Sequence, residues 1–272
     1  MLRQRSVFIL KVLLAITVVY LSFQCTLNSK TTNTTLKDAM WPGLRVVTTF
    51  EKDRRTSRMV FIGGPPYSGA TLMRDLLNLH PRMTCRMPPK GMVLSRLAGL
   101  RTQWDITQAK SNGLREIGLT AREIDTVVKK FILKALGVPA KSNKTVEACV
   151  EDDSALNSME YLRELFPGSK FILLVRDGRT LVQSIISGKV KVSGYDASNY
   201  EKCFKQWDEN VKNLYNNCLD AGSSTCTVIY YEKLRRNPLK WLKYVLSFLQ
   251  VDWKPSILHH LDRVESEDVL QK

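Results

Sequence analysis

The sequence predicts an α/β fold: a P-loop-like parallel sheet flanked by helices, preceded by an N-terminal membrane anchor helix. Short apolar segments alternate with longer segments of helical periodicity, which is typical of a parallel sheet covered on both faces. A glycine-rich loop of phosphate-loop spacing, residues 64–71, follows the first apolar segment. A second apolar run, residues 7–23, is long enough to span a bilayer as a helix.

The composition is that of a globular protein with excess positive charge. The chain has 272 residues, 44% hydrophobic and 25% charged, and 41 Lys and Arg against 26 Asp and Glu give a net charge of +15. This mixture excludes a disordered tail, a collagen and a membrane bundle, and it suits one domain of about 200 residues with additional segments. The charge predicts an anionic partner: nucleic acid, an acidic membrane, or a phosphorylated or sulfated ligand.

The N-terminal segment favours an uncleaved signal-anchor. The basic sequence MLRQR precedes the apolar run Val7–Phe23, which only Lys11 interrupts. Basic residues at this place keep the N-terminus cytoplasmic and direct the remainder across the membrane. A cleaved signal peptide is the alternative, although the run ends without the small-residue cleavage pattern. We therefore expect a cytoplasmic tail at residues 1–6, a transmembrane signal-anchor at 7–24, a lumenal stem at 25–57 and a folded domain at 58–272.

Glycosylation triplets and cysteines suit a lumenal domain. Asn33 and Asn143 each begin an acceptor triplet for N-glycosylation. None of the six cysteines forms the C-x-x-C pair that is typical of zinc or redox chemistry. In an oxidising lumen, Cys218 and Cys226 can close a small loop, which stabilises the fold by about 2.5 kcal/mol. Buried free thiols are the alternative, and the sequence alone leaves both open.

The first half of the folded domain predicts one strand and three helices. Residues 58–62, RMVFI, form a short apolar strand, and a helix is expected at 71–79 after the glycine-rich loop. Thr120–Glu123 has the spacing of a capping box, and apolar residues then recur at helical spacing over 124–135. Residues 159–166 are also amphipathic, and Pro and Gly follow them directly, which ends that helix.

The second half alternates strand and helix. Residues 171–175 are fully apolar and predict a buried strand, which a charged sequence ends. A long helix is expected at 200–219, a strand at 225–231 and a last helix that ends at Leu249. Asn237-Pro238 begins this last helix, because Pro is favoured at the first helical position.

Gly64–Thr71 has the spacing G-x-x-x-x-G-x-[ST] of a phosphate-binding loop. Ala70 stands where a nucleotidase carries Lys, which argues against an ATPase or a GTPase. Backbone N–H groups of the loop and the N-terminus of the next helix still predict a pocket for phosphate or sulfate. A plain Gly/Pro turn is the alternative.

A second anion-binding position lies at the end of the strand 171–175. Ligands bind at the carboxyl ends of strands in such sheets, where Arg176 lies, with Ser184 on the following helix. An ion pair between Arg176 and Asp177, or a helix cap, is the alternative. Two such strand ends in one sheet predict a nucleotide that carries phosphates at two places.

Nine short motifs follow one another from residue 61 to residue 260. They are FIGG at 61–64, SG at 68–69, TLMR at 71–74, HP at 80–81, LFP at 165–167, VRDGR at 175–179, YEKL at 231–234, FLQ at 248–250 and HH at 259–260. Together they resemble the protein-tyrosine sulfotransferases. The resemblance implies a Golgi type II membrane protein that transfers sulfonate from 3′-phosphoadenosine 5′-phosphosulfate (PAPS) to tyrosines in acidic motifs of secretory-pathway proteins. It also implies a homodimer, no metal, and disulfides that join Cys85 to Cys149 and Cys218 to Cys226.

The resemblance also implies a donor site, with departures from the family. The 5′-phosphosulfate would bind at Tyr67, Ser68, Gly69, Ala70 and Thr71, the 3′-phosphate at Arg176 and Ser184, and the donor also at Tyr231. The family carries Arg at Tyr67, Thr at Ala70 and Arg at Gly188. The chain also ends, at Lys272, before the family's last donor-binding segment.

The catalytic positions differ most. Pro88 replaces the family's base, a Glu; Lys90 replaces a substrate-binding Arg; and Glu151 replaces a Lys that assists the sulfonate. Loss of the base alone lowers the rate by about 10² to 10⁴. We expect weak or absent activity unless another carboxylate acts as base, and the candidates are Glu151 and Asp152, with Glu147 and Asp153 beside them. The alternative for these four is a solvated acidic turn before a helix that begins near Ser154.

The sequence and the resemblance together predict two alternative functions. The first is a protein-tyrosine sulfotransferase with reduced or rearranged chemistry. The second is a catalytically inactive relative, a pseudoenzyme that binds nucleotide, acidic peptide or an active homologue. Nucleic-acid binding is disfavoured, because the sequence has an anchor and lacks a cluster of aromatic and basic residues. A carbohydrate sulfotransferase is disfavoured by the match to the tyrosine-specific family.

Overall fold

The computed structural model describes residues 58–88, 94, 96–99, 120–137, 147–188 and 192–258. The expected tail, anchor and stem, Asn33, Lys90, Asn143 and the HH motif lie outside these ranges. Within them, no helix has both the length and the apolar character needed to cross a bilayer.

Five parallel strands form one sheet, which confirms the predicted α/β fold with a parallel sheet. They are β1 (Met59–Gly63), β2 (Met83–Arg86), β3 (Glu147–Glu151), β4 (Lys170–Val175) and β5 (Cys226–Tyr230). Their order across the sheet is β2-β3-β1-β4-β5. β1 therefore lies at the centre, and the loop that follows it leaves the middle of the carboxyl edge.

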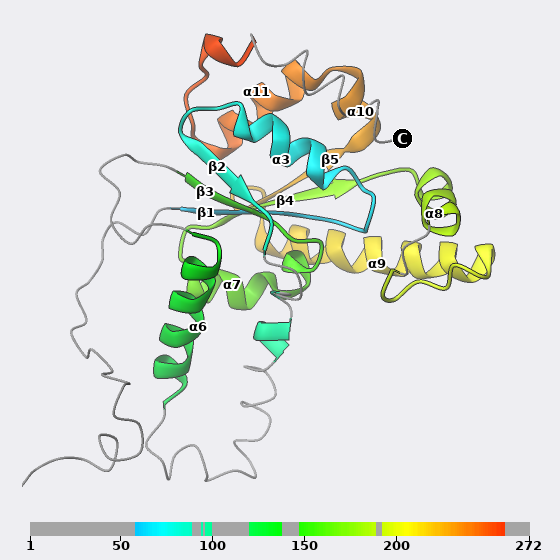
Figure 1. The fold of residues 1–272 in the computed structure, drawn as a ribbon, viewed down its shortest axis with the longest axis horizontal. Helices are drawn as coiled ribbons and strands as arrows, with labels where there is room; N and C mark the ends of the chain where they lie inside the picture. The colour runs from blue at the N-terminus through cyan, green and yellow to red at the C-terminus, as the bar shows by residue number, and fades with distance from the viewer. Residues whose placement is uncertain are drawn as a thin grey trace, which may run out of the picture. The chain divides into compact units, whose positions relative to one another are not determined.

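The helices cover both faces of the sheet (Figure 1). The α-helices are α3 (Ala70–Asn78), α6 (Ala121–Ala135), α7 (Met159–Leu165), α8 (Gly178–Ser187), α9 (Tyr200–Ala221), α10 (Tyr231–Arg236) and α11 (Pro238–Leu249). Two short 3-10 helices are η2 (Ala155–Ser158) and η3 (Pro255–Ile257). The predicted capping box of α6 is confirmed, because Thr120 and Glu123 each accept a hydrogen bond from the other's backbone N–H.

β1 is buried on both faces, as its unbroken apolar sequence requires. Successive side chains of a strand point to opposite sides of the sheet. Val60 and Ile62 pack with α3 and α11, whereas Met59 and Phe61 pack with α6, α7 and α9 on the other side. The two layers hold the carboxyl ends of β3, β1 and β4 in fixed relative positions.

Two strands were not expected from the sequence. β2 is a short edge strand whose residues alternate between buried and exposed, and β3 has only three apolar residues between two glutamates. The interpretation of Glu147–Asp153 as a solvated acidic turn is therefore wrong for its first part, which forms β3. The predicted strand 225–231 is also one residue too long at its end, because Tyr231 begins α10.

Two disulfides link elements of the sheet. Cys85 of β2 is joined to Cys149 of β3, its register partner, and Cys218 of α9 is joined to Cys226 of β5. These are the pairs that the resemblance implies, and the alternative of free thiols at Cys218 and Cys226 is wrong. Cys203 of α9 is a buried free cysteine that packs in one cluster with residues of α8.

Candidate functional site

The loop between β1 and α3 presents an open helix N-terminus. Ser68 N–H donates to the carbonyl oxygen of Pro65 at 3.0 Å, which folds the loop back on itself. Gly69 begins the helix with a φ of 97°, and no side chain caps it. A helix N-terminus without a side-chain cap leaves backbone N–H groups for an anion. The loop is therefore a turn, as in the alternative interpretation, and its uncapped N-terminus has the backbone geometry that the predicted anion pocket requires.

Two glycines allow the loop to pack closely against its neighbours. A Cβ at Gly64 would lie 2.3 Å from the carbonyl oxygen of Leu174 in β4. A Cβ at Gly69 would lie 2.3 Å from Cδ2 of Tyr231. No other residue fits at either position without displacing the backbone or the ring. The loop therefore lies directly against the carboxyl ends of β4 and β5.

Arg176 completes this arrangement from the end of β4. Its Nη1 donates to the carbonyl oxygen of Tyr67 at 3.1 Å, and its guanidinium lies 4.7 Å from the centre of the Tyr231 ring. Asp177 pairs with Arg179 at 2.6 Å, and hydrogen bonds from Arg179 lower the Asp177 pKa to about 2. The alternative in which Arg176 pairs with Asp177 is wrong, and the guanidinium stays beside the loop.

Two buried donors at this place have no hydrogen-bond partner in the described part of the chain. They are Oγ of Ser68 and Nε of Arg176, and Ser68 is only 1% exposed. Buried polar groups are nearly always paired, so an orphaned donor in a loop indicates a missing acceptor. An anion bound at the loop would supply acceptor oxygens for both groups.

The remaining predicted donor residues lie along the same edge. Ser184 is on α8, where its hydroxyl donates to the Thr180 carbonyl oxygen at 2.9 Å. A Cβ at Gly188, one turn later, would lie 3.2 Å from the Tyr67 hydroxyl. Tyr67 therefore extends from the loop to the last turn of α8, with an unusual φ of 65° for an aromatic residue. The structure thus brings together Tyr67, Gly69, Arg176 and Tyr231, with Ser184 on the adjoining helix.

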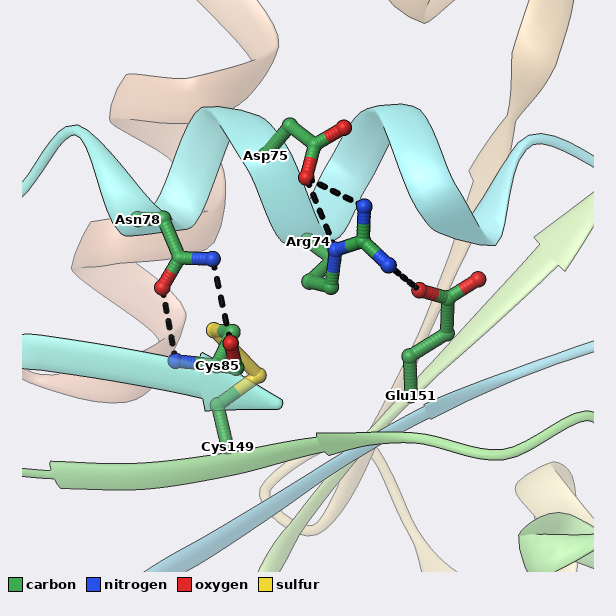
Figure 2. Close-up of a disulfide and its surroundings, with 6 residues drawn as sticks. All are labelled: Arg74, Asp75, Asn78, Cys85, Cys149 and Glu151. Carbon is green, nitrogen blue, oxygen red and sulfur yellow. Dashed lines mark hydrogen bonds and ion pairs between the residues drawn. A yellow bond between two sulfur atoms is a disulfide. The ribbon is translucent and has the colours of Figure 1, made fainter. Parts of the chain in front are cut away.

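Glu151 at the end of β3 is buried. It forms an ion pair with Arg74, as Figure 2 shows. Its side chain is 8% exposed, and its two oxygens accept from the Thr71 hydroxyl at 2.6 Å and from Nη1 of Arg74 at 2.8 Å. The Arg74 guanidinium also binds Asp75 at 2.6 Å. Sequence reasoning missed Arg74, although its place one turn after Thr71 on the loop helix marks it as a neighbour of any anion there.

Asp152 and Glu147, two other carboxylates considered as a replacement base, have contacts or positions of their own. Asp152 accepts from the backbone of Leu94 and from both the N–H and the hydroxyl of Ser154. Glu147 begins β3, at the opposite end of the strand from the loop. Pro88 follows β2 and has no proton to exchange.

Asp153 is an exposed carboxylate two residues beyond the end of β3. Although part of its side chain is exposed, the protein around the carboxylate raises its pKa to about 7, and the negative charges of Glu151 and Asp152 add to this effect. In the described residues, no group of three or more His, Cys, Asp or Glu is arranged to hold a metal ion.

The chain is similar to known sulfotransferases. Residues 59–255 match the model of the sulfotransferase family. The chain is 37% identical to the protein-tyrosine sulfotransferase of Drosophila melanogaster over 209 residues, which are 76% of this chain and 40% of that protein. It is also 37% identical to protein-tyrosine sulfotransferase 1 of Danio rerio over 205 residues, 74% of this chain and 56% of that protein.

A solved structure shares the fold. The sulfotransferase domain from the curacin biosynthetic pathway superposes with a TM-score of 0.50 at 19% identity, covering 75% of this chain and 77% of that one. At this identity the likeness concerns the fold alone. The chain spans about half the length of the curated relatives that it matches.

Proposed function

Because the chain belongs to the sulfotransferase family and, within it, to the protein-tyrosine sulfotransferases, we propose that it transfers the sulfonate of PAPS to tyrosine hydroxyls of proteins. The observation that carries this proposal is the contact between Arg176 and the phosphate loop. Two cation- and amide-rich strand ends meet there, which is what a nucleotide with two separate phosphates requires. The family implies PAPS as the donor.

The residues at the site fit such a nucleotide. The loop backbone from Ser68 to Thr71 would hold the 5′-phosphosulfate, with the orphaned Ser68 hydroxyl as a further donor. Arg176 and Ser184 would hold the 3′-phosphate, and Tyr231 would contact the donor. When bound, PAPS supplies a sulfonate activated by its phosphate leaving group. The chain's own part is to bind the two charged ends and to place the sulfonate at the carboxyl edge of the sheet.

A second candidate is a catalytically inactive relative. One observation favours it: the position beside the loop is held by Glu151, whose negative charge opposes the charge that develops on a transferring sulfonate. Pro88 cannot remove the phenolic proton, and tyrosine in solution has a pKa of about 10. Such a protein would bind the nucleotide, an acidic peptide or an active homologue without turnover.

The setting of the activity is part of the proposal. Acidic motifs of secretory-pathway proteins are the proposed acceptors, which the net charge of +15 supports. A Golgi location with a single N-terminal anchor is supported by the apolar run at 7–24 and by the two disulfides, since disulfides persist in oxidising compartments. Glycosylation at Asn33 and Asn143 and a homodimer are proposed from the sequence and the resemblance.

Turnover separates the two candidates. The full chain in detergent is incubated with radiolabelled PAPS and a peptide that carries tyrosine among acidic residues, and a peptide with phenylalanine at that position is the control. Label on the tyrosine peptide alone supports the enzyme. PAPS binding without label transfer supports the inactive relative. Absence of PAPS binding contradicts both the enzyme and a relative that binds the nucleotide.

A further inference from the structure

Thr71 and Arg74 lie on the first turns of α3, directly after the phosphate loop. Thr71 is the second residue of α3 and Arg74 follows three positions later, so the two side chains share one face of the helix. A hydroxyl and a guanidinium beside a helix N-terminus are well suited to donate to a phosphate. By position alone, both side chains would be expected to face a phosphate that the loop holds.

Both donors are instead bound by Glu151 at the end of β3. The Thr71 hydroxyl donates to one carboxylate oxygen at 2.6 Å, and Nη1 of Arg74 donates to the other at 2.8 Å. Figure 2 shows the Arg74 side chain reaching from α3 to Glu151, with Asp75 on the same guanidinium. The Glu151 carboxylate therefore occupies the two donors in the way that a bound anion would.

The same carboxylate places a negative charge beside the loop. The single positive charge of Arg74 faces the carboxylates of Glu151 and Asp75, so these three side chains together carry one negative charge. The Glu151 side chain is only 8% exposed, and salt screens a buried charge little. Thr71 carries the hydroxyl that Glu151 binds and also one of the uncapped backbone N–H groups of the helix. A phosphate on that N–H group is therefore close to a like charge, which repels it.

We propose that Glu151 competes with the nucleotide at the phosphate loop and so lowers the affinity of the site. This inference rests on the proposed function, because it takes the loop as the place of the 5′-phosphate. A phosphate can take the Thr71 and Arg74 donors only by displacing the carboxylate, and it is repelled until that happens. The effect is the same for every nucleotide that places a phosphate on the loop. Glu151 thus limits nucleotide affinity by acting through Thr71 and Arg74.

The test is a calorimetric titration of the full chain in detergent with adenosine 3′,5′-bisphosphate, which has the two phosphates of PAPS without the sulfonate. Glu151→Gln removes the charge, and its neutral amide binds Thr71 and Arg74 more weakly than a carboxylate does. We expect this variant to bind the bisphosphate about tenfold more tightly than the parent. Glu147→Gln is the matched control, because Glu147 begins the same strand about 13 Å away, and we expect it to bind as the parent does.

A gain in affinity distinguishes competition from a structural role of Glu151, because damage to the fold would weaken binding. Equal or weaker binding by Glu151→Gln, or an equal gain in Glu147→Gln, overturns the competition and leaves the proposed nucleotide site intact. Absence of binding by both the parent and Glu151→Gln overturns the proposed function itself, whereas binding by Glu151→Gln alone supports both proposals. If Glu151→Gln does not fold by circular dichroism, Glu151→Met replaces it, since methionine is of similar length and carries no charge.

Discussion

Arg176 donates a hydrogen bond to the backbone carbonyl oxygen of Tyr67, which lies 109 positions earlier in the chain, at a distance of 3.1 Å. This bond joins the end of β4 to the loop after β1. The Tyr231 ring, at the end of β5, packs against both Arg176 and Gly69. Three strand ends thereby form one surface, and the predictions below test its parts.

The first prediction concerns the close contact of Gly69 with Tyr231. Gly69→Ala adds a methyl group 2.3 Å from the ring at a φ of 97°. We expect a loss of about 2 to 3 kcal/mol in the free energy of unfolding, together with weaker nucleotide binding. Gly168→Ala is the control, because its φ is 82° and no atom lies within 4 Å of the added carbon. It is expected to lose about 1 kcal/mol and to bind normally. Equal losses of Gly69→Ala and Gly168→Ala in urea unfolding would contradict the close contact between Gly69 and the Tyr231 ring.

The second prediction concerns the buried pair of Arg74 and Glu151. Arg74→Met leaves the Glu151 carboxylate buried without its cation, and we expect a loss of about 3 kcal/mol. Glu151→Gln is expected to lose about 1 kcal/mol, because Arg74 keeps Asp75 and the amide oxygen can still accept from Thr71. Urea unfolding measures both, and the double variant is expected to be more stable than Arg74→Met alone. A larger loss in Glu151→Gln than in Arg74→Met would contradict the inference that Arg74 stabilises the buried Glu151 carboxylate.

The third prediction concerns the pH dependence that Asp153 causes. Its pKa is about 7 in the folded chain against 3.8 as the ordinary value, so the folded state binds the proton more tightly. The stability that this proton contributes is complete below the lower pKa and is lost as the pH rises through the higher one. Asp153→Asn is therefore expected to be more stable than the parent at pH 8 but not at acidic pH. Urea midpoints across this range that differ by a constant amount would exclude a raised pKa.

The fourth prediction concerns the two disulfides. Cys85 and Cys149 are 64 residues apart in sequence, whereas Cys218 and Cys226 are 8 apart. In the chain-entropy model, the longer loop stabilises the fold by about 4 kcal/mol and the shorter by about 2.5 kcal/mol. We expect the Cys85→Ala/Cys149→Ala variant to unfold at lower urea than Cys218→Ala/Cys226→Ala. The reverse order would show that packing at the cysteines, and not loop closure, sets their contribution.

The fold class was predictable because the strongest periodicities belong to the central elements. β1 and residues 171–175 of β4 are unbroken apolar segments, and α6 begins at a capping box that both the sequence and the structure show. β3 was missed because its apolar part is only three residues long and both of its ends are glutamates. Glu151 is buried because it contacts Thr71 and Arg74 of α3, and such tertiary contacts cannot be predicted from the local sequence around Glu151.

The candidate site was predictable where a motif or a general rule applies. The spacing of a phosphate-binding loop led to residues 64–71, and the rule that ligands of parallel sheets bind at the carboxyl ends of strands led to Arg176. The pair of Arg74 and Glu151 lies 77 residues apart in sequence and depends on β3 lying next to β1, which was not recognised. The position of Tyr67 against Gly188 likewise depends on the packing of α8 beside the loop.

The most direct test of the account is a calorimetric titration of adenosine 3′,5′-bisphosphate into Arg176→Ala and Arg179→Ala. Arg179 is the matched control, because it is a neighbouring arginine whose side chain is 80% exposed and paired with Asp177. If Arg176 and the loop bind one nucleotide together, Arg176→Ala binds about 10- to 100-fold more weakly than the parent, and Arg179→Ala binds as the parent does. Equal affinities in the parent and in Arg176→Ala would contradict the account.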